Sequence, residues 1–429
     1  MEITPPNSLL IKMKFIARKN KNRSFWAMGF LCLTVNFAHA QTYIRTVFAI
    51  PETGITKGYT DTFGEDNDVF TQSIKLQNIN DNIVFDSTTK LMWQRGDGGE
   101  MTYWNAKHYC DTLTLGGFTD WRLPTPLEAY SIIHLEKNNP SLDVNYFKIT
   151  GAEYWYTAIT QQNDTTKVWV TNSGGGIGNH PRSETISSGG TKKFHVRAVR
   201  NSWSDTFTEK FTITSTGLVL DNRSNLSWIV FPDSISATWT QALVFANHFT
   251  SKKCHVPNIK ELQSLADYQM IQPCIDKSIF PSTSTSKYWS SSTLFNQASR
   301  AWYMDAKFGI TTYSDKVTKL NLALVCENSP QAGINNATLV KSTFELYPNP
   351  TQDFLNFQYS NFDEILKNIH YLLVIGLDGR TLRLEPTSLI RNKDHLQIDV
   401  RNLNTGIYIL KAIGNSNQIL DESFFIIAR

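Results

Sequence analysis

Two copies of one sequence pattern follow each other in this chain, and this repeat constrains the fold more than any other feature. The first copy is clearest at Gly116–Thr125, which reads Gly-Gly-Phe-Thr-Asp-Trp-Arg-Leu-Pro-Thr. Its surroundings return 133 to 135 residues later. The matching pairs are Asp86 and Asp221, Trp93 and Trp228, Trp104 and Trp239, Pro124 and Pro257, Glu128 and Glu261, and Tyr154 and Tyr288. Units of this length predict two tandem domains rather than a solenoid, whose repeating units are shorter.

Local signals in the first copy predict both helices and strands. Thr102 is placed to cap one helix, and Thr125 with Glu128 forms the capping box of another. One face of the first helix is expected to be buried and carries Trp104, Cys110 and Leu113. Most of the remainder reads as strands, including Ile83–Asp86, Leu91–Gln94, Glu153–Thr157, Lys167–Thr171 and Phe194–Arg200. The sequence therefore predicts an α+β fold.

Residues 1–40 have the three parts of a secretory signal peptide. Six Lys and Arg residues precede a short apolar run, Phe25–Leu33, and the small-residue end Ala38-His39-Ala40 precedes Gln41. A transmembrane anchor is the alternative, but this run is too short to span the hydrocarbon core of a bilayer, and no downstream run is longer. The sequence therefore predicts export, with cleavage near Ala40 and no transmembrane segment.

The net charge argues against nucleic-acid binding. Six of the 41 Lys and Arg residues and one of the 38 Asp and Glu residues lie in the leader, which leaves a net charge of −2. A chain of that charge has no long-range positive field to steer it to nucleic acid or to an anionic membrane.

Four cysteines follow the leader: Cys110, Cys254, Cys274 and Cys326. An oxidising compartment allows any of their three pairings. Cys254 and Cys274 are close in sequence and are the candidates for a disulfide that closes a short loop. No Cys-x-x-Cys pair is present, so neither a zinc ribbon nor a thioredoxin-like site is predicted, and no metal ligands are assigned.

An acidic patch before the first copy is a weak calcium candidate. Glu65, Asp66 and Asp68 alternate as calcium ligands can, but the patch lacks the glycine and the distal glutamate of an EF-hand loop. A solvated loop is the expected structure. Calcium is thus the one cofactor considered, and otherwise none is expected.

Four stretches of the first copy resemble the Lcl C-terminal domain family: Leu91–Gln94, Asp120–Thr125, Tyr154-Trp155 and Val196–Arg200. The resemblance covers residues 50–328, and in the second copy Lys253-Cys254-His255-Val256-Pro257 replaces the Asp-Trp-Arg-Leu-Pro signature. The family takes its name from a collagen-like bacterial adhesin and is related in fold to C-type lectin-like domains. Two tandem lectin-like modules are therefore implied, the second of them degenerate.

The resemblance also bears on the cysteines. The family often pairs a helix cysteine with one in the closing strand. Cys110 has the first place in module one and Cys326 the second in module two, while Ala198 and about Phe245 stand in the partner places. The family disulfide is therefore not expected in either module.

The C-terminal part resembles a second family, the type A sorting domain of the type IX secretion system of Bacteroidota. The residues that carry this resemblance are Tyr347, Pro348, Asn349, Pro350, Gly379, Gly406 and Tyr408. Regularly spaced short strands with turn signals such as Asp378-Gly379 predict an all-β, immunoglobulin-like sandwich. Passage through the type IX machinery, then release or attachment at the outer-membrane surface, is implied.

The predicted organisation is a signal peptide at 1–40, a lead-in at 41–81, module one at 82–201, module two at 202–328, a polar linker at 329–343 and a sorting domain at 344–429. In a lectin-like fold the ligand usually sits on long loops between late strands. Here those loops are residues 157–195 and 292–320.

Aromatic and basic side chains are the candidate ligand contacts. Tryptophans can stack on sugar rings, and arginines can bind polar or anionic groups. The candidates are Arg122, Trp155, Trp169, Arg182, Arg197, Trp289 and Trp302. Core packing is the alternative for each tryptophan, and an internal ion pair is the alternative for Arg122 and Arg197. The glycine-rich Gly174–Gly178 is neither a P-loop nor a dinucleotide fingerprint, and we expect a loop.

Three functions remain open on the sequence alone. The first is an adhesin that binds an extracellular glycan or glycoprotein, although the Glu-Pro-Asn and Gln-Pro-Asp pairs of calcium-dependent lectins are absent. A sulfated glycan, suggested by the namesake adhesin, would have only local pairs such as Lys192-Lys193 and Lys252-Lys253. The second is a structural surface protein that binds other proteins. The third, a relative of the formylglycine-generating oxidase, would need two cysteines in the closing region, where only Cys326 lies. We expect a binding protein with no catalytic residues.

Overall fold

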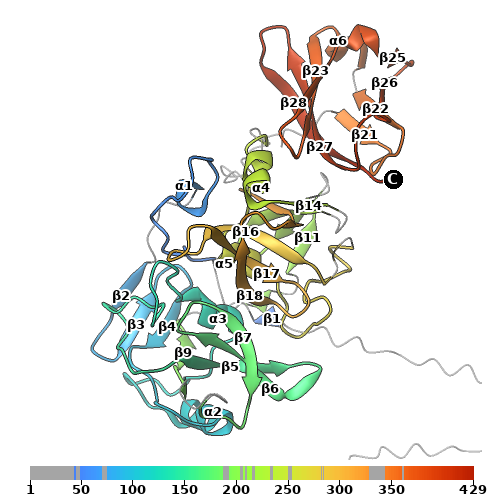
Figure 1. The fold of residues 1–429 in the computed structure, drawn as a ribbon. Coiled ribbons are helices and arrows are strands. Elements are labelled where there is room, and N and C mark those ends of the chain that lie inside the picture. Colours follow the sequence, from blue (N-terminus) through green and yellow to red (C-terminus); the bar gives the residue numbers. More distant parts are fainter. Residues whose placement is uncertain are drawn as a thin grey trace, which may run out of the picture. The chain divides into compact units, whose positions relative to one another are not determined.

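Figure 1 shows the computed structural model of the chain. The structure describes residues 43–44, 49–69, 75–186, 193–202, 206–207, 210–214, 218–231, 235–249, 254–281, 283, 285–327, 344–359 and 362–429. The predicted signal peptide and linker lie outside these residues. The described residues form mostly strands, with short helices between them.

Module one has an antiparallel sheet in the order β2-β3-β4-β9. Its strands are β2 (Leu76–Asn78), β3 (Ile83–Asp86), β4 (Leu91–Gln94) and β9 (Val199–Asn201). Helix α2 (Tyr103–Thr112) begins at the predicted cap, where the Thr102 side chain accepts from the amide of Asn105. Helix α3 (Pro126–Ser131) has the predicted capping box. Both helix starts are confirmed because side-chain caps are local interactions.

Module two repeats this plan. Its sheet order is β11-β12-β13-β20-β15, all antiparallel. The strands are β11 (Phe211–Ile213), β12 (Val219–Asp221), β13 (Leu226–Val230), β20 (Ala323–Glu327) and β15 (Cys254–His255). Helices α4 (Trp239–Ala246) and α5 (Ile259–Ser264) both begin with a capping box.

A third sheet runs through both modules. Its order is β14-β19-β16-β17-β18-β7-β6-β5-β8. Module two contributes β14 (Ser236–Ala237), β19 (Leu320–Asn321), β16 (Lys287–Thr293), β17 (Arg300–Asp305) and β18 (Ile310–Asp315), and module one contributes β7 (Ile177–Pro181), β6 (Asp164–Asn172), β5 (Tyr154–Gln161) and β8 (Phe194–His195). The two modules join where Thr311 pairs with Ile177. A separate short pair links β1 (Tyr43–Ile44) to β10 (Thr206–Phe207).

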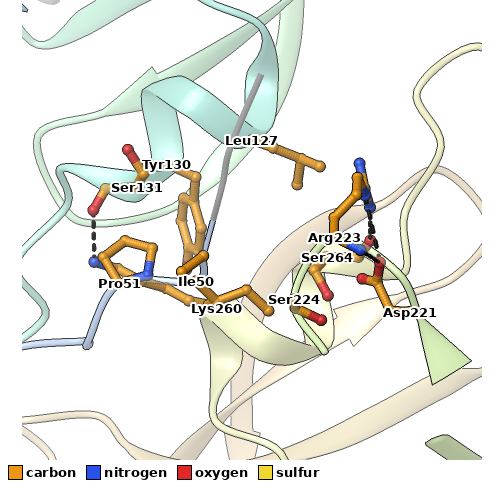
Figure 2. Close-up of a pocket in the computed structure, with 11 residues that line it drawn as sticks. Ile50, Pro51, Leu127, Tyr130, Ser131, Asp221, Arg223, Ser224, Lys260 and Ser264 are labelled. Carbon is orange, nitrogen blue, oxygen red and sulfur yellow. Dashed lines mark hydrogen bonds and ion pairs between the residues drawn. The ribbon is translucent and has the colours of Figure 1, made fainter. Parts of the chain in front are cut away.

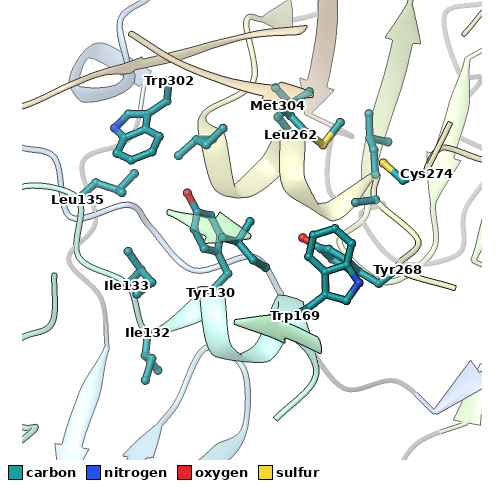
Figure 3. Close-up of a cluster of buried hydrophobic side chains, with 14 of the residues drawn as sticks. Tyr130, Ile132, Ile133, Leu135, Trp169, Leu262, Tyr268, Cys274, Trp302 and Met304 are labelled. Carbon is teal, nitrogen blue, oxygen red and sulfur yellow. The ribbon is translucent and has the colours of Figure 1, made fainter. Parts of the chain in front are cut away.

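The two modules also share a hydrophobic core, shown in Figure 3. Tyr130 and Trp169 of module one face Tyr268 and Met304 of module two within one cluster. The rings of Trp169 and Tyr268 meet edge to face, with centroids 4.9 Å apart. Fully burying a large apolar side chain stabilises a fold by roughly 1.5–3 kcal/mol, so this shared core holds the modules together.

The acidic patch is not the solvated loop that the sequence predicted. Glu65 and Asp66, at the start of α1 (Asp66–Val69), are fully buried. Ser292 Oγ donates to Asp66 Oδ2 over 2.5 Å, and Thr293 Oγ1 donates to Glu65. Hydroxyl groups of β16 therefore replace water around these carboxylates, and the lead-in packs on module two.

The predicted match between Trp104 and Trp239 is wrong by one residue. Thr102 and Thr238 cap α2 and α4, so Tyr103 is the structural counterpart of Trp239, rather than Trp104. Tyr103 and Trp239 are buried, whereas Trp104 is 58% exposed. The expectation that Trp104 shares the buried face with Cys110 was wrong, because Tyr103, Ala106 and Cys110 have the i, i+3, i+7 spacing of one helical face and Trp104 lies outside it.

The C-terminal part has two four-stranded antiparallel sheets. One contains β21 (Phe344–Tyr347), β22 (Phe354–Tyr359), β26 (His395–Asp399) and β25 (Ile390–Arg391), and the other contains β24 (Thr381–Leu384), β23 (Ile369–Gly376), β27 (Gly406–Gly414) and β28 (Ile419–Ile427). A short helix α6 (Phe362–Leu366) and a 3-10 turn η1 (Pro386–Ser388) interrupt the strands. Side chains of both sheets, among them Phe357 and Phe425, share one buried cluster. The predicted Asp378-Gly379 turn joins β23 to β24, with Gly379 at a φ of 78°.

Candidate ligand groove between the modules

A groove lies along the join between the two modules and meets both of the predicted loop regions. Its cavity measures about 330 Å³, which falls within the size range of small-ligand sites. Its lining residues are Asn138, Asn139, Glu153, Tyr154, Asn172, Ser173, Gly174 and Gly176 from module one, and Leu294, Phe295, Asn296, Gln297, Trp302, Thr311, Thr312 and Tyr313 from module two. The lining thus combines side-chain amides, hydroxyls and aromatic rings.

The module-one wall is the turn between β6 and β7. Asn172 Oδ1 accepts from the amides of Gly174 and Gly176 over 2.9 and 3.1 Å. A Cβ atom at Gly176 would lie 2.9 Å from Asn172 Nδ2, so a larger residue there would displace the Asn172 side chain. Gly175, at a φ of 91°, completes the turn. The glycine-rich segment, predicted to be a loop, is therefore a hydrogen-bonded hairpin turn that fixes Asn172 at the groove.

The module-two wall is the turn between β16 and β17 together with β18. Asn296 and Gln297 are exposed in this turn, which the bond from Gln297 N to Leu294 O closes over 2.9 Å. Tyr313 is 41% exposed and lies edge-on to Trp302, with centroids 5.7 Å apart. An exposed tyrosine over a buried tryptophan gives the groove a fixed aromatic edge.

Among the described lining residues, Glu153 is the one that brings a carboxylate to the groove. Glu153 is half-buried, and its Oε2 accepts from Ser173 Oγ over 2.8 Å. A smaller recess of about 80 Å³ shares Asn139, Glu153 and Ser173 with the groove and adds the exposed Lys148. Glu153 therefore stands between the two hollows.

The four candidate tryptophans do not offer a ring face to a ligand. Trp155, Trp169, Trp289 and Trp302 are between 0% and 6% exposed. The expectation that they stack on sugar rings is corrected, because each ring is packed inside the protein. Only Trp302 lines the groove, beneath Tyr313. Core packing, the alternative for all four, is what the structure shows.

Two of the candidate arginines hold the protein together. Arg122 grips both carboxylate oxygens of Glu128 over 2.8 and 2.7 Å. Arg197 is buried and donates to the carbonyl oxygens of Gln94 and Arg95 over 2.9 and 2.8 Å. Burial lowers the pKa of Arg197 to about 10. Neither side chain lines the groove. Their internal contacts therefore give both arginines a structural role.

Arg182 lies at a different surface. Its guanidinium carbon is 4.8 Å from the centroid of the exposed Trp104 ring. It also lies 5.9 Å from the centroid of Tyr103, and the contact that corresponds to this one in module two is Lys316 over Trp239, at 3.7 Å. The structure thus does not bring Arg182 into the groove, and sequence reasoning missed the exposure of Trp104.

A buried dyad near the recess was also missed. His195 Nδ1 lies 3.0 Å from Asp97 Oδ1, and Trp155 Nε1 donates to Asp97 Oδ2 over 3.3 Å. Burial alone would raise the pKa of Asp97, but hydrogen bonds from His195 and Thr150 and the charge of Arg197 bring it below its usual value. No sequence motif links Asp97 to His195, so only the fold reveals the pair.

The cysteine pairing differs from the sequence prediction. Cys254 is bonded to Cys326, and Cys274 is a buried free thiol, so the predicted Cys254–Cys274 bond is wrong. The two bonded residues lie directly opposite each other on β15 and β20. Short sequence separation is a weak guide, because neighbouring strands bring distant residues together.

This disulfide is also not the one that the family often forms. Trp93 lies opposite Val199, and its counterpart Trp228 lies opposite Val325. Val325 therefore corresponds to Val199, and Cys326 to Arg200 rather than to Ala198. Cys254 and Cys326 therefore occupy the positions in module two that Trp121 and Arg200 occupy in module one.

A second hollow, shown in Figure 2, is too small for an organic ligand. It measures about 30 Å³, enough for a water molecule. Lys260 Nζ donates to the carbonyl oxygens of Glu52 and Ser131 over 2.6 and 2.8 Å. On the other side, Arg223 Nε lies 3.5 Å from Asp221 Oδ1. Lys260 of module two thereby connects the lead-in and module one at this hollow.

Within the described part of the chain, no three His, Cys, Asp or Glu side chains are grouped so that they could hold a metal ion. The same residues include no helix with the length and apolar character needed to cross a bilayer.

Asn349 of the sorting motif connects the end of β21 to the last strand, β28. Tyr347 to Pro350 are exposed at the end of β21. Asn349 Oδ1 accepts from the amide of Ile426, and Asn349 Nδ2 donates to Phe424 O over 3.1 Å. Tyr408 OH donates to Asn404 O over 2.9 Å at the start of β27. The motif is therefore tied to β28, the last strand.

Comparison with known proteins identifies two families. The Lcl C-terminal domain matches residues 82–200 and 217–326, and the secretion system C-terminal sorting domain matches residues 345–427. No curated protein sequence matches the chain. A type IX sorting tail implies a secreted or surface protein. Since the first family accounts for more than half of the residues, the chain belongs to the Lcl C-terminal domain family, in two tandem copies followed by a type IX secretion sorting domain.

Proposed function

We propose that this protein is an adhesin-like binding protein that recognises an extracellular glycan or glycoprotein in the groove between its two modules. The observation that carries the proposal is the groove lining, where side-chain amides and hydroxyls surround a tyrosine edge. Sugars present many hydroxyl groups and apolar ring faces, and both match this lining. The lead-in and modules would act as one binding unit, and the tail would direct export.

The proposal includes the finer features that the sequence suggests. We propose a lectin-like fold for the modules, an immunoglobulin-like fold for the tail and removal of the signal peptide near Ala40. The helices and strands repeated in both modules support one common fold for the two modules.

A non-catalytic role is part of the proposal. Burial raises the pKa of Cys110 to about 12 and that of Cys274 to about 12, so neither thiol would be a thiolate at neutral pH. This favours binding over an oxidase that depends on reactive cysteines. No cofactor is proposed, and calcium is tested directly by chelation.

The experiment is a glycan-array screen of the full-length protein, repeated with EDTA and at raised salt. Tyr313→Ala and an Asn296→Ala, Gln297→Ala double variant should lose binding at least tenfold, as expected for groove contacts. Trp104→Ala, at an exposed tryptophan outside the groove lining, is the matched control and should bind normally. Loss with EDTA would indicate a metal-dependent site. The absence of binding under every condition would refute glycan recognition and leave a structural role.

A further inference from the structure

We infer that the groove selects uncharged or amino-bearing sugars and rejects sulfated or uronic ones, with Glu153 as the selecting residue. This inference rests on the proposed glycan-binding function and names the ligand class of the same site. It differs from the polyanion that the resemblance to an adhesin suggests.

The first support is the charge of the lining. Among the lining residues that the structure describes, none is Lys, Arg or His, and the only carboxylate is that of Glu153. A sulfate or carboxylate of a ligand would leave water without finding a cation in this lining, which is costly. Arg300, 5.6 Å from the Tyr313 ring, is already paired with Asp315 over 2.9 Å. Side-chain amides such as those of the exposed Asn296 and Gln297 suit hydroxyl and acetamido groups, because an amide both donates and accepts hydrogen bonds.

The second support is the state of Glu153 itself. Within the described residues, its side chain has one hydrogen bond, from Ser173 Oγ, and no ion pair. Its backbone is fixed from both sides, since Glu153 N donates to Lys193 O over 3.0 Å and Ser173 N donates to Glu153 O over 2.9 Å. A held carboxylate without a cationic partner would attract a ligand ammonium group and repel an anion.

The basic side chains near this part of the groove do not reverse its charge. Lys148 lines the adjoining recess and is exposed to solvent. Lys193 is exposed and lies 3.7 Å from Glu100, so its charge is already offset. Lys192, Lys252 and Lys253, the remaining basic residues of the polyanion hypothesis, lie outside the described residues.

The test compares three matched probes on the full-length protein: chitosan oligosaccharides with free amino groups, chitin oligosaccharides with neutral acetamido groups, and heparin oligosaccharides of similar length. We expect the amino form to bind best, the neutral form next and heparin at least tenfold more weakly than either. Glu153→Gln keeps an oxygen for Ser173 and should reduce the preference for the amino form about tenfold, roughly the effect of one partly desolvated charge pair. Raised salt should weaken only the amino form.

Asp61→Asn removes an exposed carboxylate outside the groove and is the matched control. Preferential binding of heparin that Tyr313→Ala abolishes would overturn this inference while supporting glycan recognition in the groove. An amino preference that survives Glu153→Gln, in a variant with the wild-type melting temperature, would also overturn it. If none of the three probes and no glycan on the array binds, the proposed function itself fails.

Discussion

His255 Nε2 lies 3.3 Å from Glu261 Oε2 in module two, at the place where Arg122 holds Glu128 in module one. Both glutamates also close the capping box of the helix behind them. Both are almost completely buried. The capping carboxylate thus keeps a basic partner in module two although the Asp-Trp-Arg-Leu-Pro signature is lost, which indicates that the pair serves the fold rather than a ligand.

Removing this partner should destabilise module one. In Arg122→Met the carboxylate of Glu128 stays buried beside the helix N-terminus without its cation, and we expect a loss of about 2 to 3 kcal/mol. Arg122 is about one-third exposed, which reduces the effect below that of a fully buried pair. Urea denaturation measures the change. Glu128→Gln added to Arg122→Met should recover part of the loss, and equal stability of Arg122→Met and wild type would show that the pair contributes nothing.

Asp66 should make stability depend on pH. Burial raises its pKa to about 7 from an ordinary value of 3.8, and hydrogen bonds from Ser292 and Thr53 offset only part of this effect. A raised acid pKa means that the stabilising contribution is complete below pH 3.8 and is lost as the pH rises through 7. Asp66→Asn cannot titrate, so its stability relative to wild type should rise by about 2 to 4 kcal/mol between pH 4 and pH 8.

The difference between variant and wild type is the quantity to measure. Burial lowers the pKa of the nearby Lys260 to about 7, and this group loses its contribution as the pH falls from 10.5 through 7, the opposite direction. Denaturation curves at several pH values give the free energy of unfolding of Asp66→Asn and of wild type. Their difference at each pH isolates the contribution of Asp66. Asp61→Asn, at an exposed carboxylate, should stay within about 0.5 kcal/mol of wild type throughout. A pH-independent difference for Asp66→Asn would contradict the prediction.

The disulfide should be a major stabiliser of module two. Cys254 and Cys326 are separated by 72 residues, and closing a loop of that size restricts the unfolded chain. Changing both to alanine should cost about 2 to 5 kcal/mol, measured by urea denaturation without reductant. Cys274→Ala removes a buried thiol without removing a bond, and it should cost less. Peptide mapping that finds Cys254 bonded to Cys274 would refute the structural pairing.

Local features of this chain could be predicted from sequence, and distant pairings could not. The caps at Thr102 and Thr125 depend on residues three positions away, so the helix starts were evident. The pairing of Ile177 with Thr311 joins segments that no motif links, so the shared sheet was invisible. For the same reason, the sequence predicted two separate ligand-binding loops, and it did not predict that they line one groove.

Burial was the hardest property to predict. A tryptophan can be a sugar-stacking platform as well as a core residue, and alternation along a strand does not say which face is covered by the other module. Trp169 illustrates the problem, because its cover is Tyr268 of module two. Trp104 shows the reverse case, since Tyr103 and Cys110 take the buried face of its helix and Trp104 is left in solvent.

Trp169 and Trp104 therefore form a matched pair that tests whether the two modules unfold together. Trp169→Ala removes a fully buried ring at the join and should cost about 3 to 5 kcal/mol, whereas Trp104→Ala should change stability by no more than about 0.5 kcal/mol. Because the Trp169 ring packs on Tyr268, the loss should reach both modules. Hydrogen exchange should show β16–β18 losing protection together with β5–β7 in Trp169→Ala. Protection lost only in β5–β7 would mean that the shared sheet and core do not couple the modules.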